Sequence, residues 1–135
     1  MKRLQMVLIS SIAILVFGVY ALAVSPDHEF SVKEYNEFHE VLHALQHDAL
    51  PKGDFATIRT RSGELIKHGK KIVKLGVPRG TKAEKHEEFK SGLAKFNEAL
   101  AKFRTDAKSG SEEQLKASFS AVHDQFEELA GMLPR

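Results

Sequence analysis

The sequence predicts an all-α protein, an antiparallel up-down-up-down four-helix bundle preceded by an N-terminal signal peptide. Four segments carry apolar residues at alternating steps of three and four, which is the spacing of one helix face. Residues typical of helix starts and stops separate these segments, and the short loops favour antiparallel packing of successive helices. After the N-terminal apolar run, no segment shows the pattern of a β-strand.

The N-terminus has the composition of an export signal. Lys2 and Arg3 form a short basic start, the following residues 4–23 carry no charge, and Ala21-Leu22-Ala23 supplies the small residues of a cleavage site. The apolar run is also long enough for an uncleaved membrane anchor, and membrane contact is expected only in that case. The predicted organisation is a signal peptide over 1–23, a linker over 24–30 and a bundle domain over 31–135.

The charges of the exported chain balance. Two of the 20 basic residues lie in the leader, so 18 remain after cleavage and face 18 acidic residues. A neutral chain lacks the basic footprint of a nucleic-acid-binding protein, and no nucleic-acid partner is expected. The absence of cysteine excludes disulfides, thiolate metal sites and covalent c-type haem. We therefore predict an exported, periplasmic bacterial protein held together by packing, and leave open whether it forms a homodimer.

Local signals set the helix boundaries. Three helix starts match the S/T-x-x-E/Q capping box, in which side chains satisfy unpaired backbone amides. These boxes are Ser31 with Glu34, Thr81 with Glu84, and Ser111 with Gln114. Asp54 is expected to cap the remaining helix alone. The predicted helices are 32–49, 55–75, 82–108 and 112–133.

The second predicted helix departs from the apolar pattern. Ser62 and Gly69 stand where large apolar residues are expected. Large side chains can interdigitate with small ones across a core, so we expect phenylalanines of facing helices to fill the space. The alternative is a cavity that accepts a flat cofactor.

Histidines repeat at steps of four in the first predicted helix, at His39, His43 and His47. Residues four apart are neighbours on a helix, so the first two can direct neutral imidazoles at one metal ion. In this topology the first and last helices are adjacent, and a rise of about 1.5 Å per residue brings His123 to the same height. We predict a metal site of His39, His43 and His123, with Glu127 as fourth ligand or as an acceptor behind the ligands. The alternatives are a site of His39 and His123 alone, or histidines with no ligand role.

A weaker second site is predicted at His47 and Asp54, which flank the loop after the first helix. A hydrogen bond that stabilises the loop is the alternative there. Imidazole with carboxylate and without thiolate suits Cu(II), Zn(II) or Ni(II). The predicted function is binding of such an ion for buffering, tolerance or delivery. A ligand-free interaction or stress protein, with a partner on its polar helix faces, is a further alternative.

The first two histidines also belong to an H-E-x-x-H pattern. In zinc proteases with this motif the glutamate activates a water molecule. The apolar pattern places Glu40 on the face away from the core, where no closed site forms, and no strand is present to align an extended peptide. We therefore predict no enzymatic activity and no catalytic residues.

An exported four-helix bundle of this size resembles the periplasmic cytochromes c-prime and cytochrome b562. The segment Phe119-Ser120-Ala121-Val122-His123 stands where cytochromes c-prime carry C-x-x-C-H on the last helix, with both cysteines replaced. The resemblance implies a non-covalent haem b on His123 in an electron carrier. Because the first helix has no methionine of the b562 type, His39 would be the second axial ligand. The many core phenylalanines favour a filled interior instead.

The stretch from His39 to Asp54 also resembles small uncharacterised exported bundle proteins of bacteria. This second resemblance implies no activity.

Overall fold

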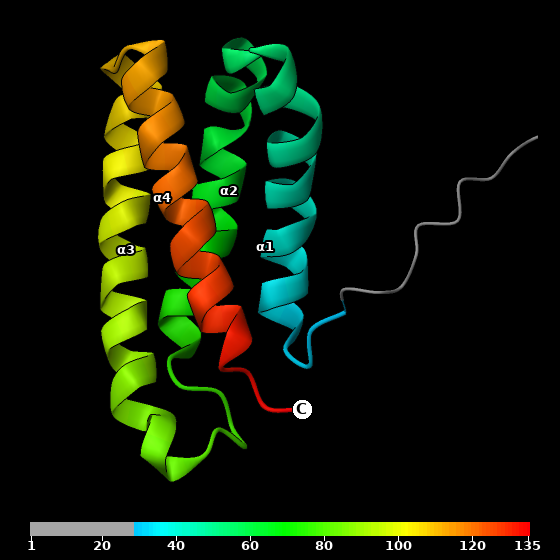
Figure 1. The fold of residues 1–135 in the computed structure, drawn as a ribbon, viewed down its shortest axis with the longest axis vertical. Coiled ribbons are helices and arrows are strands. Elements are labelled where there is room, and N and C mark those ends of the chain that lie inside the picture. Colours follow the sequence, from blue (N-terminus) through cyan, green and yellow to red (C-terminus); the bar gives the residue numbers. More distant parts are fainter. Residues whose placement is uncertain (1–28) are drawn as a thin grey trace, which may run out of the picture.

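A computed structural model describes residues 29–135, which form four α-helices and contain no β-strand (Figure 1). The helices are α1 (Lys33–Ala44), α2 (Phe55–Leu75), α3 (His86–Ser109) and α4 (Glu112–Gly131). In Figure 1 the chain can be followed up α1, down α2, up α3 and down α4. The all-helical prediction is confirmed for this range. No helix within it is long and apolar enough to span a membrane, and the predicted leader lies outside the described residues.

The core combines aromatic side chains of α1, α3 and α4 with aliphatic side chains of α2. Its largest fully buried side chains are Tyr35, Phe38, Phe89, Phe96, Phe103, Phe119 and Phe126. Backbones approach closely in the successive pairs α1–α2, α2–α3 and α3–α4. Between α1 and α4 large rings make the contact: Phe126 lies 4.8 Å from Phe38 and 5.8 Å from Tyr35, measured between ring centroids. This spacing leaves a groove between the first and last helices.

The small residues of α2 accommodate large neighbours. A Cβ placed on Gly69 would lie 2.7 Å from Leu100 Cδ1 and 3.2 Å from Phe38 Cε2. Leucine and phenylalanine together therefore fill the space that we expected phenylalanines to fill. The half-buried Ser62 donates its hydroxyl to the carbonyl of Arg59 at 2.7 Å.

Two of the four predicted helix caps are confirmed. Ser111 and Gln114 form a complete capping box at the start of α4. Asp54 caps α2, since its Oδ1 accepts the Thr57 amide at 3.0 Å. Both caps use partners three residues apart.

The other two capping boxes were wrong. The residue that precedes α1 is Val32, which makes no side-chain cap, and the Ser31 hydroxyl donates to the carbonyl of Pro134. Thr81 donates its hydroxyl to the Pro78 carbonyl at 2.8 Å, and a 3₁₀ turn over Ala83–Lys85 precedes α3. In both places the hydroxyl has a carbonyl acceptor outside the helix.

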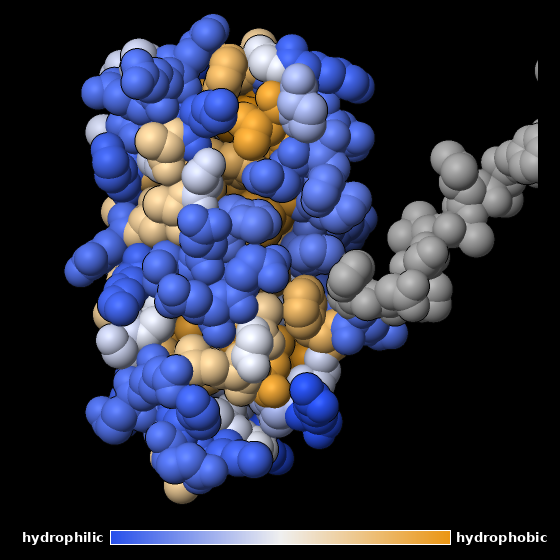
Figure 2. Space-filling view, in the orientation of Figure 1, coloured by the Kyte–Doolittle hydropathy of each residue, from blue (hydrophilic) through white to orange (hydrophobic). Residues whose placement is uncertain are grey.

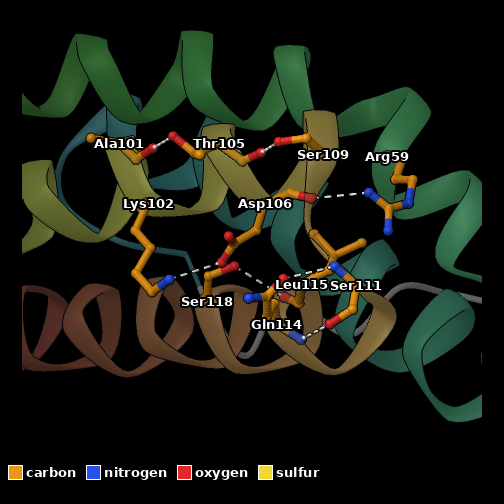
Figure 3. A network of polar contacts seen from close by, with 10 residues as sticks. All are labelled: Arg59, Ala101, Lys102, Thr105, Asp106, Ser109, Ser111, Gln114, Leu115 and Ser118. Atoms are coloured by element: carbon orange, nitrogen blue, oxygen red, sulfur yellow. Dashed lines mark hydrogen bonds and ion pairs between the residues drawn. The ribbon is translucent and has the colours of Figure 1, made fainter.

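Arg59 of α2 closes the end of α3. Its guanidinium donates to the carbonyl of Asp106 at 2.9 Å (Figure 3). It also donates to the carbonyls of Ala107 at 3.1 Å and Gly110 at 2.7 Å. The last carbonyls of a helix have no partner within the helix, so an outside donor stabilises them. The buried Asp106 carboxylate also pairs with Lys102 at 3.2 Å. The start of α2 is thereby tied to the end of α3.

Two glycines of α2 give a matched test of this packing. A Cβ on Gly63 meets nothing within 4 Å, so Gly63→Ala should stabilise the protein by about 0.5–1 kcal/mol through helix propensity. Gly69→Ala should instead press against Leu100, and overpacking typically costs about 1–3 kcal/mol. Urea unfolding should therefore rank Gly63→Ala above the wild type and Gly69→Ala below Gly63→Ala. Equal gains in the two variants would contradict the close packing at Gly69.

Candidate functional site

A groove of about 370 Å³ runs between α1 and α4. Its walls are formed by Phe30, His39, Leu42, His43, Gln46, His47, His123 and Glu127. Four of the seven histidines of the chain thus line one groove, together with one carboxylate. Figure 2 shows apolar surface between these two helices, bordered by hydrophilic residues. The predicted ligands His39, His43, His123 and Glu127 all lie here, on the two helices that the prediction paired.

The His39 ring packs against two aromatic side chains, which also contact each other. It lies 5.4 Å from the ring of Phe30, edge to face, and 6.0 Å from Phe126, stacked at 17°. The residue is half-buried. These two contacts restrict the orientation of the His39 ring more than that of the exposed histidines of the groove.

The next two histidines are exposed and close together. The His43 ring lies 5.7 Å from that of His39 and 4.4 Å from that of His47, between centroids. The predicted first helix does not continue as an α-helix here, because a π turn over Leu45–Ala49 follows α1. A π turn holds about one residue more than an α turn, and His47 stays over His43. Such turns are frequent at functional sites.

His47 and Asp54, paired in our weaker second site, have different surroundings. Asp54 accepts the Thr57 amide with Oδ1 and the Thr57 hydroxyl with Oδ2, at 3.0 and 2.6 Å. These two hydrogen bonds, the hydroxyl first, lower the pKa of the Asp54 carboxyl. Asp54 does not line the histidine groove, whereas His47 does.

On α4, His123 has a carboxylate behind it. Its Nδ1 lies 3.2 Å from Oδ1 of Asp124, and its side chain is 32% exposed. A carboxylate accepts, so Nδ1–H donates and Nε2 keeps its lone pair for a ligand. Metal-binding histidines commonly use such a carboxylate to fix tautomer and ring orientation. We did not single out Asp124 from the sequence, although it directly follows His123.

The candidate metal-binding side chains line the same groove, but they do not converge on one position for a metal ion. Within residues 29–135, no three His, Asp or Glu side chains are placed so that they could hold one metal ion. Zinc requires ring nitrogens at about 2.0–2.1 Å, so ligation needs side-chain rotation. His43, His47 and Glu127 are exposed and able to rotate.

The glutamate of the H-E-x-x-H pattern lies elsewhere. Glu40 lines a separate cavity of about 280 Å³ between α1 and α2, which also includes Glu37, His68 and Lys71. There the His68 Nδ1 is 3.5 Å from Glu37 Oε2, but the two are not in hydrogen-bond geometry. Glu40 is not part of the groove that His39 and His43 line.

No family model matches the chain, and neither a curated protein nor a solved structure shows a significant match. The resemblance to cytochromes c-prime and b562 therefore stays a prediction.

The ion pairs of Glu37 give a pH prediction. Lys71 at 2.8 Å and then Lys33 at 3.4 Å lower the pKa of Glu37 below its ordinary 4.5. A carboxyl whose pKa is lower in the folded than in the unfolded state stabilises the folded protein at pH values above its unfolded-state pKa. This stabilisation is lost as the pH falls through the folded-state pKa. Glu37→Gln should therefore lose less stability between pH 6 and pH 3 than the wild type in urea unfolding. Glu98→Gln, a change at an exposed residue in the middle of α3 without an ion pair in the described range, should follow the wild type. Equal losses of unfolding free energy in both variants would contradict this role of Glu37.

Proposed function

We propose that this protein is an exported up-down-up-down bundle, with its leader removed after Ala23, that binds one divalent transition metal ion. Cu(II), Zn(II) and Ni(II) are the candidate ions, because imidazole and carboxylate donors suit them. The observation that carries the proposal is the gathering of four histidines and Glu127 in the groove between α1 and α4. His39, His43 and His123 are the proposed ligands, with Glu127 as the fourth ligand or an acceptor behind them.

The division between fixed and mobile donors supports a binding role. His39 is held by aromatic rings and His123 by Asp124, so two imidazoles are oriented before the ion arrives. His43 and Glu127 are exposed and can close on the ion or release it. Gln46 also lines the groove, and its buried Oε1 has no hydrogen-bond partner among the described residues. An open site of this kind fits buffering, tolerance or delivery of the ion.

Calorimetry of the processed protein with each ion should give one tight site per chain. His39→Ala/His123→Ala should weaken binding more than about tenfold, since loss of a supporting group alone costs 10–100-fold. Binding should also weaken as pH falls below about 6.5, because protonated imidazole cannot ligate.

His86→Ala is the matched control. His86 is exposed, its Nε2 lies 2.9 Å from the Thr81 carbonyl, and it does not line the groove. This variant should bind as the wild type does. Unchanged metal affinity in the His39→Ala/His123→Ala variant would show that these two histidines do not form the site. Uptake of haem with a Soret band that disappears in His123→Ala would favour the electron-carrier alternative instead.

The contact between the Asp124 carboxylate and His123 Nδ1 allows a second, independent test. Asp124→Asn keeps the side-chain volume but weakens the acceptor at Nδ1, and should reduce metal affinity about 10–100-fold without changing the stoichiometry. In ¹⁵N spectra of the metal-free protein, the His123 ring should shift from the Nδ1–H toward the Nε2–H tautomer. Glu128→Gln removes the same charge from α4 outside the groove and should change neither quantity. An unaltered tautomer in Asp124→Asn would show that Asp124 does not orient His123.

A further inference from the structure

A second groove, of about 430 Å³, lies between α2 and α3 and is lined by cations. Lys70 comes from α2, and Arg104 and Lys108 come from α3. Asn97 adds a side-chain amide, and Ile66 and Leu100 form an apolar floor. No carboxylate lines this groove, and it shares no lining residue with the histidine groove.

These three cations have no counter-charge within the described range. The ion pairs there involve other basic side chains, and neither Lys70, Arg104 nor Lys108 takes part. Arg104 and Lys108 are also four residues apart on one helix, where like charges repel. An anion in the groove would relieve that repulsion and stabilise the folded protein.

The groove is part of a wider separation of charge. Helix α2 carries six basic residues and one acidic residue: Arg59, Arg61, Lys67, Lys70, Lys71 and Lys74 against Glu64. Helix α4 has the reverse balance, with Lys116 against Glu112, Glu113, Asp124, Glu127 and Glu128. A chain that is neutral after loss of its leader therefore presents a positive surface on α2, which raises the local concentration of anions.

We propose that the groove between α2 and α3 binds a phosphate-type anion, either a soluble phosphate or the phosphodiester of a lipid headgroup. The planar guanidinium of Arg104 can donate two parallel hydrogen bonds to phosphate oxygens. Lys70 and Lys108 supply charge, and the Asn97 amide supplies a further donor. Three cations in one groove suit a single anionic group rather than an extended polyanion.

The test uses the metal-free protein with inorganic phosphate and pyrophosphate in one arm, at constant ionic strength. Vesicles of phosphatidylglycerol, with phosphatidylcholine vesicles as reference, form the other arm. The variant Lys70→Gln/Arg104→Gln/Lys108→Gln removes the groove cations. The matched control Lys82→Gln/Lys95→Gln/Lys116→Gln removes the same charge at exposed sites outside the groove.

We expect the anion to raise the melting temperature, and the groove variant to bind at least about tenfold more weakly than the control variant, because hydrogen bonds to charged groups are the strong ones. A response to phosphates identifies a soluble ligand, and a response only to phosphatidylglycerol identifies a headgroup. The proposal would be overturned if both triple variants lost the same anion affinity. It would also be overturned if neither phosphates nor phosphatidylglycerol vesicles raised the melting temperature of the wild type. Metal affinity should be unaffected by the groove variant, so this outcome is independent of the histidine site.

Discussion

The ring of Phe126 holds the first helix to the last, and the histidine groove depends on it. Four rings surround Phe126, at centroid distances of 4.8–6.0 Å: Phe30, Tyr35, Phe38 and His39. Aromatic pairs of this kind contribute about 0.5–1.5 kcal/mol each beyond the area they bury. Because this contact is made by large side chains, the helix backbones stay apart and the groove remains open. Burial also raises the pKa of the Tyr35 hydroxyl in the same cluster.

The aromatic cluster also explains why the proposed ligands differ in mobility. His39 is part of the cluster, so the core restricts the motion of its ring. His43 and His47 lie outside the cluster and are exposed to solvent. His47 stays on the groove next to His43, four residues earlier, although the backbone there forms a π turn over Leu45–Ala49. In the proposed site, a few side-chain rotations of His43 and Glu127 would bring these donors to the ion and release it again.

Helices α2 and α3 are joined by both polar and apolar contacts. Arg59 satisfies three carbonyls at the end of α3, and Leu100 packs into the space at Gly69. Cations that are not used in these contacts remain along the α2–α3 groove, and no acidic residue of α4 lines it. Net charge therefore says little about this surface, since two helices of opposite charge cancel in the total. The pairing of α2 with α3 brings like charges together.

Local interactions were determined by the sequence alone. The helical class, the bounds of α2 and the caps at Asp54 and Ser111 involve partners only a few residues apart, and the step of four places His39 beside His43. Tertiary structure decided the rest. The Ser31 hydroxyl bonds a carbonyl 103 residues away instead of capping a helix, and Phe126 of the last helix packs against the His39 ring of the first. The helix spacing that opens the groove and the cations shared by α2 and α3 depend on how non-local side chains pack, and no periodicity along the chain encodes that.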